Sequence, residues 1–586
     1  GIIDGGFQYN HINFYDTEGK NLRIKRVWNQ NQSGTPPTGY YYGTEYTNAE
    51  EIIASKQDYA ASHATHVTGI AAGAYKGNEY YGIAPDADLV LVSYNISDNS
   101  SSNTSITDGI KYIYDYAESV GKPCVINMSL GYHIGPHDGT STFDRICDEL
   151  QGEGRLLVGA SGNEAEYNIH ATKTLKKGDT NMKSLVEFVS NWYLYGSMTS
   201  TVDIWGDAEK QLSARVFVYD ILNKKEVYSS ESFSTTASAS KKISNPTGAD
   251  GNIYISTATN PYNKKGNITI DLNLSSFDNR NYYIGFEISG PEETTINAWT
   301  DAYMSWLSNF GNNEFTNGDN NSTMGEIGGT GKRIITVGAY TSCNYIDHKN
   351  SSMWNNSGQT LNQLVSFSSL GPTADGRMKP DITAPGSMLI SSFNSSTSSN
   401  RNGEDYNYVV KQENVNTVNY YYGSMEGTSM ATPVVTGILA TWLQANPKLT
   451  PEQVREILSN TATTDSYTGN IAGVGNNRWG YGKINAYDGL VYCLNHSGIE
   501  QIGTPTRPMV YPNPATDICY FLLQNDDKNV NVSIYTLNGT EIYSRYMGNI
   551  NAGEQNQLDL SDLAAGIYFI HITGDKTNMT TKLTVK

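Results

Sequence analysis

Residues 427–433 read GTSMATP, and the run PVVTGILATWLQAN (433–446) continues directly from them. The apolar residues of this run recur at helical spacing, which predicts a buried helix. Ser429 would enter that helix directly after Gly427 and Thr428. A hydroxyl at this position either caps the helix or serves as a nucleophile. Other stretches of the sequence distinguish between these two interpretations.

Two further stretches carry the partners that a serine nucleophile needs. SHATHVTGIAAG places His63 in the first turn of a predicted helix, and GIIDGG places Asp4 at the end of a predicted buried strand. Attack by a serine hydroxyl requires a neutral imidazole that takes the proton and a carboxylate that orients the imidazole. Asp, His and Ser in this chain order form one of the known arrangements of such a triad.

The stretch VGASGNEAE (158–166) ends a predicted strand close to Asn163. A side-chain amide there can donate to a developing oxyanion, together with the N–H of a serine at a helix N-terminus. The structural alternatives are that Asn163 is a turn residue and that Asp4 is an ordinary strand-end carboxylate. His63 and His66 could also share a metal from one helix face, but the chain has no HExxH pattern, and we expect His66 to pack or to hydrogen-bond structurally.

The chain around these stretches predicts an α/β fold. Up to about residue 170, short apolar runs such as ADLVLVSY, PCVINMSLG and RLLVGASGN alternate with helix-like segments such as TSITDGIKYIYDYAESVG. Such repeated strand–helix units predict a parallel sheet with helices on both faces and functional loops at the carboxyl ends of the strands. The same character returns at RIITVGAY (333–340), and a capping box predicts a helix start at Thr450.

Two other segments alternate apolar and polar residues with period two, which is typical of β-sandwiches. One includes TSTVDIWGD, SARVFVYDI and NYYIGFEISG, and the other includes ICYFLL, NVSIYTL and IYFIHI. We therefore expect an all-β, jelly-roll-like domain inserted into the α/β domain and a small C-terminal β-sandwich. The predicted order is a first catalytic part at 1–172, the insert at 173–314, a second catalytic part at 315–495, a linker at 496–508 and the C-terminal sandwich at 509–586.

The four stretches resemble the motifs of the subtilisin-like serine proteases, the subtilases. Supporting matches are GIAPDADLVLV (82–92), VINMSLG (125–131), SFSSLGPT (366–373), KPDITAPG (379–386) and LTPEQVREIL (449–458). The resemblance covers about 1–170 and 315–495. It implies that Ser429 is the nucleophile, His63 the general base and acid, Asp4 its orienting carboxylate and Asn163 the oxyanion donor. It also implies substrate-binding residues: Ser129, Leu130 and Gly131 as an edge strand that pairs with the substrate backbone, and Ala160, Ser161 and Gly162 as a wall of the first specificity pocket.

The chain departs from the subtilase pattern at several points. Ala64 replaces the usual glycine between His and Thr, and Gly5–Gly6 replaces the commoner Thr/Ser-Gly after Asp4, so one hydrogen bond to Asp4 is expected to be absent. The insert lies between Asn163 and Ser429 in the sequence. We expect the floor of the first specificity pocket near residues 326–333. His133 and His137 are expected to lie in a solvent-exposed loop rather than to contact substrate.

Composition limits the partners. The 586 residues carry a net charge of −19 with a pI of about 4.9, which disfavours nucleic acid. No apolar run is long enough to predict a transmembrane segment. The spacing of the five cysteines does not match that of a metal site, and this spacing does not assign any disulfide. No cofactor is required for the chemistry; structural Ca²⁺ would suit a subtilase, with its ligands unknown.

The segment 505–586 resembles the C-terminal sorting domain of proteins exported by the type IX secretion system of Bacteroidetes. VYPNPATD (510–517), LAAGIYFIHI (563–572) and the terminal TKLTVK carry this resemblance. It implies a secreted or cell-surface protein of a Gram-negative bacterium; the alternative is a generic β-sandwich appendage that docks on the protease. An N-terminal propeptide or upstream segment is expected beside Gly1, because subtilases normally have more chain before the Asp strand.

The sequence thus predicts a secreted or surface serine endopeptidase that cleaves protein or peptide substrates through an acyl-enzyme. The alternative is a catalytically weak or inactive protease scaffold that binds a glycan or a protein through the inserted β-sandwich.

Overall fold

The computed structural model describes residues 1–94, 103–189, 198–247, 249–301, 304–496, 509–523, 525–536 and 540–586. These residues form two compact units, Gly1–Asn495 and His496–Lys586, and each unit is described by itself. The predicted linker at 496–508 lies, apart from His496, outside the described residues.

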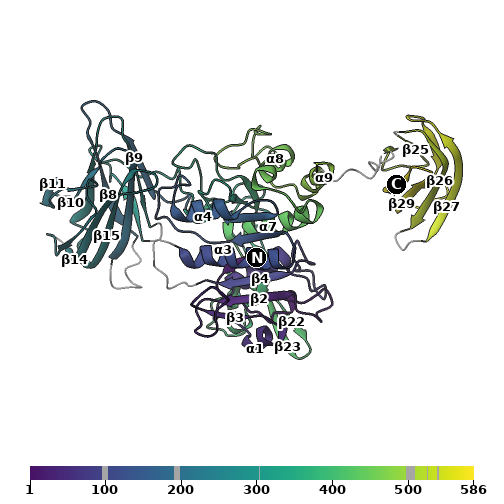
Figure 1. Ribbon diagram of the computed structural model, residues 1–586, viewed down its shortest axis with the longest axis horizontal. Coiled ribbons are helices and arrows are strands. Elements are labelled where there is room, and N and C mark those ends of the chain that lie inside the picture. Colours follow the sequence, from purple (N-terminus) through teal and green to yellow (C-terminus); the bar gives the residue numbers. More distant parts are fainter. Residues whose placement is uncertain are drawn as a thin grey trace. The chain divides into compact units, whose positions relative to one another are not determined.

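An eight-stranded sheet forms the centre of the first unit (Figure 1). Its strands lie in the order β20-β19-β6-β5-β1-β4-β2-β3, and they are parallel except for β3, which pairs antiparallel with β2. The bounds are β1 Ile2–Asp4, β2 Ile24–Asn29, β3 Thr44–Tyr46, β4 Leu89–Ser93, β5 Cys124–Met128, β6 Arg155–Ala160, β19 Ile335–Tyr340 and β20 Ile382–Pro385. The predicted parallel sheet is confirmed.

Helices cover both faces of this sheet, as predicted. Because side chains alternate along a strand, Ile2 points to the core beneath α2 and α7, while Ile3 points to a second core beneath α3 and α4. The helices are α1 Ala49–Ser55, α2 His63–Ala72, α3 Thr104–Ser119, α4 Thr142–Leu150, α6 Ser395–Ser398, α7 Thr428–Ala445, α8 Pro451–Thr461 and α9 Ala486–His496, with short 3-10 turns η1 Ile12–Phe14 and η2 Tyr406–Tyr408. The capping box of α8 forms between Thr450 and Gln453 as the sequence predicts.

A smaller antiparallel sheet, ordered β21-β23-β22, lies beside α2 in the same unit. It consists of β21 Leu389–Phe393, β22 Val409–Val415 and β23 Val418–Met425. β23 ends just before the GTSMATP segment and leads the chain into α7.

Between β6 and β19 the chain forms two antiparallel six-stranded sheets that share one apolar core (Figure 1). We call this segment the insert. One sheet contains β8 Asn181–Phe188, β10 Ser213–Asp220, β11 Lys225–Ser229, β12 Phe233–Ser234, β16 Tyr282–Ser289 and β18 Ser305–Ser308; the other contains β7 His170–Thr174, β9 Met198–Ala208, β13 Ala239–Ser244, β14 Ala249–Thr259, β15 Lys265–Phe277 and β17 Thr295–Thr300.

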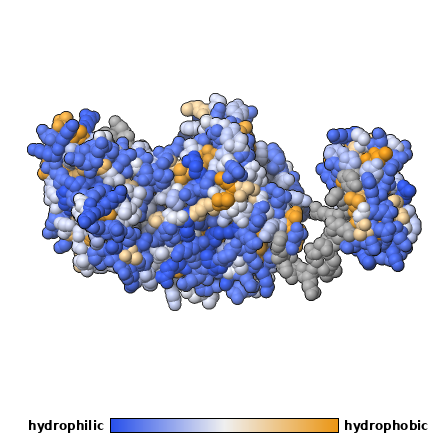
Figure 2. Space-filling model, turned by 90° about the horizontal axis from the view of Figure 1, so that it is seen from above, coloured by the Kyte–Doolittle hydropathy of each residue, from blue (hydrophilic) through white to orange (hydrophobic). Residues whose placement is uncertain are grey.

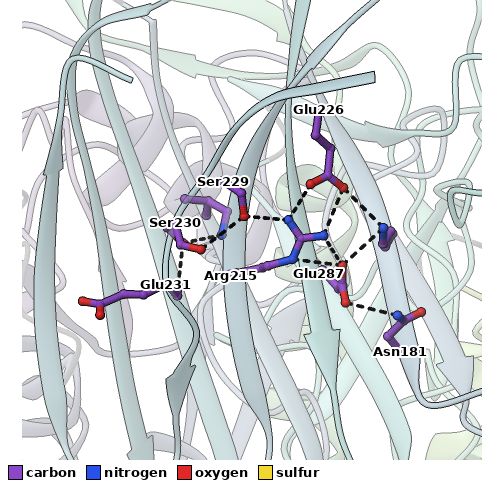
Figure 3. A network of polar contacts seen from close by, with 9 residues as sticks. Asn181, Arg215, Glu226, Ser229, Ser230, Glu231 and Glu287 are labelled. Atoms are coloured by element: carbon purple, nitrogen blue, oxygen red, sulfur yellow. Dashed lines mark hydrogen bonds and ion pairs between the residues drawn. The ribbon is translucent and has the colours of Figure 1, made fainter. Parts of the chain in front are cut away.

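Ion pairs link neighbouring strands in one sheet of the insert (Figure 3). The Arg215 guanidinium on β10 pairs with Glu226 on β11, at 2.6 Å from Nη1 to Oε2, and with Glu287 on β16, where Nε lies 3.1 Å from Oε2. Lys183 on β8 lies 3.3 Å from both carboxylates. One guanidinium therefore links three adjacent strands.

The second unit is a small β-sandwich. Its two sheets are ordered β24-β25-β28 and β27-β26-β29-β30 and enclose their own apolar core. The strands are β24 Met509–Tyr511, β25 Ile518–Leu522, β26 Asp527–Thr536, β27 Glu541–Ile550, β28 Asn556–Asp559, β29 Gly566–Thr573 and β30 Asn578–Val585. The predicted C-terminal sandwich is confirmed.

Hydrophilic residues dominate the face of the molecule in Figure 2, in keeping with the acidic composition. None of the described helices is long and apolar enough to cross a membrane. All five cysteines are unpaired, so the structure contains no disulfide among them.

Candidate active site

The carboxyl ends of three neighbouring strands place the predicted residues along one edge of the central sheet. β1 lies between β4 and β5, and β5 is followed in the sheet by β6. In this register Asp4 ends β1, Ser129 follows the end of β5, and Asn163 follows β6 by three residues. Residues far apart in the sequence meet here because parallel strands end at the same sheet edge.

Asp4 is buried behind His63, the first residue of α2. Its Oδ1 lies 2.8 Å from His63 Nδ1 and accepts a hydrogen bond from the Gly5 N–H at 2.6 Å. Asp4 Oδ2 has no hydrogen-bond partner among the described residues, as expected from the glycines that follow it. A Cβ on Gly5 would lie 2.2 Å from the Tyr59 hydroxyl, so a larger residue there would require the exposed Tyr59 ring to move.

The charge of Asp4 controls the ionisation of His63. Burial by itself would lower the pKa of the imidazole, but the Asp4 charge and hydrogen bond outweigh it and raise the pKa above its usual value. The His63 side chain is still 38% exposed. The imidazole is therefore held in orientation on one side and accessible to a reacting group on the other.

Ser429 lies in the first turn of α7. The preceding Gly427 has φ +146°, a conformation suited to glycine. Ser429 Oγ donates to the Ser129 carbonyl oxygen at 3.4 Å, and Ser129 Oγ donates to the Ser429 carbonyl oxygen at 2.8 Å. Among the described residues His63 is not a hydrogen-bond partner of Ser429, although both line one cavity. The hydrogen bond between a serine nucleophile and its histidine base is often long or poorly aligned before substrate binds.

The side chain of Asn163 is oriented by Thr428. Asn163 Oδ1 accepts from the Thr428 N–H at 2.9 Å and from Thr428 Oγ1 at 3.1 Å. Because Oδ1 is held in this way, the amide Nδ2 is the end of the side chain that remains for donation. It lies beside the N-terminus of α7, whose first N–H groups have no partner within the helix.

His63, Asn163 and Ser429 line one cavity of about 510 Å³. Of the predicted site residues, those that line it are His63, Leu130, Gly131, Ala160, Gly162, Asn163 and Ser429. Asp4 lies behind His63, while Ser129 and Ser161 are buried beside the cavity without lining it. None of residues 326–333, where the pocket floor was predicted, lines this cavity. The segment contacts the cavity walls through hydrogen bonds from Gly325 N to Ser161 O at 3.0 Å and from Glu326 N to Tyr132 O at 2.6 Å.

Comparison with known families matches residues 1–482 to the subtilase family. The chain belongs to the subtilase family. Residues 509–586 match the secretion system C-terminal sorting domain. The sorting domain indicates export to the medium or to the cell surface. The predicted resemblances to subtilases and to this sorting domain are both confirmed.

Curated relatives of this subtilase include serine protease AprX and minor extracellular protease Vpr, both of Bacillus subtilis. The chain is 37% identical to AprX over 158 residues, which are 27% of this chain and 30% of AprX. It is 24% identical to Vpr over 493 residues, which are 81% of this chain and 50% of Vpr. The chain thus spans half or less of the length of these two relatives.

A solved structure with the same fold is that of the CspB protease of Clostridium perfringens. The TM-score is 0.62 at 19% sequence identity, with 84% of this chain and 94% of that chain covered. At this identity the likeness concerns the fold alone.

Seven further residues line the cavity of this subtilase without having been predicted as site residues: Tyr132, His133, Ile134, Glu164, Thr201, Asp301 and Thr428. Glu164 could have been found from its position next to Asn163. Thr201 and Asp301 belong to the insert, whose alternating pattern carries no signal for proximity to the predicted site residues.

The expectation that His133 and His137 lie in a solvent-exposed loop is wrong. They are only 8% and 1% exposed. The insert covers this loop, since the His137 ring stacks on Trp299 of β17 with centroids 4.1 Å apart. His133 also lines the cavity, with Nε2 3.5 Å from Glu164 Oε2.

His66 is a structural residue, as expected. It is fully buried, and its Nε2 lies 3.0 Å from the Leu389 carbonyl oxygen and 3.2 Å from that of Gly423. In the described part of the chain no group of three or more His, Cys, Asp or Glu side chains is arranged to hold a metal ion. Structural Ca²⁺ stays a prediction.

Proposed function

We propose that this subtilase is a serine endopeptidase in which Asp4, His63 and Ser429 form the catalytic triad. The observation that carries the proposal is the 2.8 Å contact between Asp4 Oδ1 and His63 Nδ1 at a cavity that Ser429 also lines. The family and its serine protease relatives support the same reaction.

In the first step Ser429 Oγ attacks the carbonyl carbon of the scissile peptide bond, and His63 Nε2 takes the hydroxyl proton. Asp4 holds the proton on Nδ1, which keeps Nε2 as the basic nitrogen, and stabilises the imidazolium that forms. His63 then gives the proton to the leaving amine, and an acyl-enzyme remains on Ser429. A water molecule, activated in turn by His63, hydrolyses this ester.

The carbonyl oxygen becomes an oxyanion in each tetrahedral intermediate. We assign Asn163 Nδ2 and the Ser429 N–H as its donors. Thr428 supports this role, because its two hydrogen bonds to Asn163 Oδ1 fix the amide before substrate arrives. Donors that are already oriented stabilise the developing charge without a cost of reorganisation.

Substrate backbone would pair with residues 129–131, and its side chain would enter between this strand and residues 160–162. Leu130, Gly131, Ala160 and Gly162 line the cavity and could contact substrate. Ser129 and Ser161 would act as supports: Ser129 bonds to Ser429, and Ser161 accepts a backbone hydrogen bond from Gly325.

The decisive experiment is Ser429→Ala combined with labelling by a fluorophosphonate probe. In subtilisin, the namesake of the family, loss of the nucleophile lowers kcat by roughly 10⁶, and we expect a similar loss here. The probe should label wild-type protein at Ser429 only. Full peptidase activity in the variant, or labelling at another residue, would refute the assignment.

The alternative function, an inactive scaffold that binds a glycan or protein through the insert, makes the opposite prediction. It requires that propeptide-free protein neither cleaves peptides nor reacts with the probe. The oriented His63 and Asn163 favour catalysis over this alternative.

A further inference from the structure

Pro433 is the sixth residue of α7, and it affects the carbonyl group of the proposed nucleophile. In an α-helix the carbonyl oxygen of one residue accepts a hydrogen bond from the N–H four residues later. For Ser429 that later residue is Pro433, which has no N–H to donate. The Ser129 hydroxyl donates to the Ser429 carbonyl oxygen at 2.8 Å. The side chain of the residue that follows β5 thus supplies the donor that the helix lacks.

Asn127, on β5, holds the Ser129 hydroxyl in this direction. Asn127 is fully buried, so its amide needs hydrogen-bond partners within the protein. Asn127 Nδ2 donates to Ser129 Oγ at 3.0 Å, and Asn127 Oδ1 accepts from Thr436 Oγ1 at 3.0 Å. Because the Ser129 oxygen accepts an N–H from Asn127, its own proton is left to point at Ser429.

A reversed Asn127 amide would give a different arrangement. Thr436 Oγ1 would then donate to the Thr432 carbonyl oxygen, which lies 3.1 Å away, and would accept from the amide nitrogen. The amide oxygen would face Ser129 and take its proton, so the Ser429 carbonyl would lose this donor. The observed arrangement is the one that pairs the Ser429 carbonyl as well as the buried amide.

The first turn of α7 is held from two sides. The Thr428 N–H donates to Asn163 Oδ1 at 2.9 Å, and the Ser429 carbonyl accepts from Ser129. Asn163 follows β6 and Ser129 follows β5, and these two strands are neighbours in the sheet. The hydroxyl and the N–H of Ser429, which are both assigned to the chemistry, belong to this turn. Their position relative to residues 129–131 therefore depends on these two bonds.

We propose that Ser129 is a positioning residue for Ser429, that its hydroxyl replaces the helical donor which Pro433 cannot supply, and that Asn127 keeps this hydroxyl in the donating direction. The proposal rests on the proposed function, because it concerns the same nucleophile. A partly buried carbonyl that loses its donor raises the free energy of the folded protein, and a shift of the helix start relieves it. Such a shift misplaces the nucleophile and lowers the rate.

The first test compares Ser129→Ala with the wild type by steady-state kinetics on a quenched peptide. Titration with the fluorophosphonate probe counts the reactive molecules, so that kcat refers to folded enzyme. We expect kcat to fall by roughly tenfold to a hundredfold. KM should change less, because Ser129 does not line the cavity. Wild-type kcat in Ser129→Ala overturns the proposal.

Ser391→Ala is the matched control for this test. The buried Ser391 hydroxyl also donates to a carbonyl oxygen of a helix, that of His66 in α2, at 2.9 Å. Ser391 does not line the cavity. The control therefore removes the same kind of bond away from Ser429, and it should keep the wild-type kcat. An equal fall of kcat in both variants would show a general structural effect and would overturn the positioning role.

The second test asks whether a restored helical donor makes Ser129 dispensable. Pro433→Ala places an N–H four residues after Ser429. In this background Ser129→Ala should lower kcat by roughly threefold or less, and the double-mutant cycle measures the difference from its effect in the wild type. A loss that is the same in both backgrounds overturns the proposal, because Ser129 would then act through another contact.

The third test leaves Ser129 and Pro433 in place and decides the question even if Pro433→Ala does not fold. Asn127→Asp keeps the shape of the side chain but replaces the donating nitrogen by an oxygen, which draws the Ser129 proton away from Ser429. We expect kcat to fall as in Ser129→Ala, and the combined variant should be no slower than the slower single variant. Losses that multiply in the combined variant would contradict a shared route to Ser429.

The Ser429→Ala variant separates failure of this proposal from failure of the proposed function. If Ser429→Ala is inactive and Ser129→Ala has the wild-type kcat, the catalytic assignment stands and the positioning role is refuted. If Ser429→Ala keeps its activity, the proposed function itself fails.

Discussion

The central sheet and the insert use their strands in different ways. The parallel strands of the sheet are buried on both faces, so only their ends are accessible, and Asp4 and Asn163 lie at or just beyond such ends. The strands of the insert are antiparallel, and polar side chains such as Arg215 run along them and link neighbours. The first arrangement gathers residues into a site, and the second stabilises a sheet.

This difference predicts separate effects of substitution. Changes at the ends of the parallel strands should reduce catalysis with little effect on stability. Changes along the strands of the insert should reduce stability and leave the chemistry intact. Four variants or measurements test this division.

The largest effect is expected for Asp4→Asn, which keeps the shape of the side chain but removes the charge that orients His63. By analogy with the same change in another Ser-His-Asp enzyme, kcat should fall by roughly 10⁴. Steady-state kinetics with a quenched peptide measure it. Asp58→Asn is the control, because the Asp58 carboxylate bonds to the Gly6 N–H and Ser93 hydroxyl and not to His63. Equal losses in both variants would contradict a specific role of Asp4.

Asn163→Ala comes next and should lower kcat by roughly 10²–10³ with little change in KM. The reason is that the amide donates chiefly to the charge of the transition state. Thr428→Val, which removes only one of the two bonds to Asn163 Oδ1, should cause a smaller loss. A variant that changed KM alone would indicate ground-state binding instead.

A smaller effect is expected in the pH profile. Catalysis needs neutral His63, and its pKa is raised, so kcat/KM should rise with pH through a midpoint above about 6.5. Removing the Asp4 charge leaves only burial, so the midpoint should move down in the residual activity of Asp4→Asn. The stabilisation that the ion pair contributes is full below the unfolded pKa and is lost as pH rises through the folded one. A midpoint that did not differ between the two proteins would rule out this coupling.

The smallest effect is expected for Arg215→Met in the insert. The Arg215 side chain is 22% exposed, and loss of its guanidinium should lower the free energy of unfolding by about 1 kcal/mol. Chemical denaturation measures this change, and kcat should equal that of the wild type. A decrease in kcat as large as that of Asn163→Ala would contradict the division between the central sheet and the insert.

The sequence predicted the parallel sheet, the helices on both faces and the contact between Asp4 and His63, because short motifs and helix signals carry them. It did not predict that Asp301 reaches the cavity or that His137 is buried under Trp299. Those contacts depend on how one domain packs on another, and hydrophobic periodicity carries no information about that packing.

The bond between Asn163 and Thr428 also has a consequence for how the protein is made. These residues are 265 positions apart, and the entire insert lies between them. Closing a loop of this length costs entropy, and this cost must be met before the contact can add to stability. On a ribosome, Asp4 and His63 emerge long before Ser429, so a partly synthesised chain holds the proposed base without the proposed nucleophile. Peptidase activity would thus begin only when most of the first unit is complete.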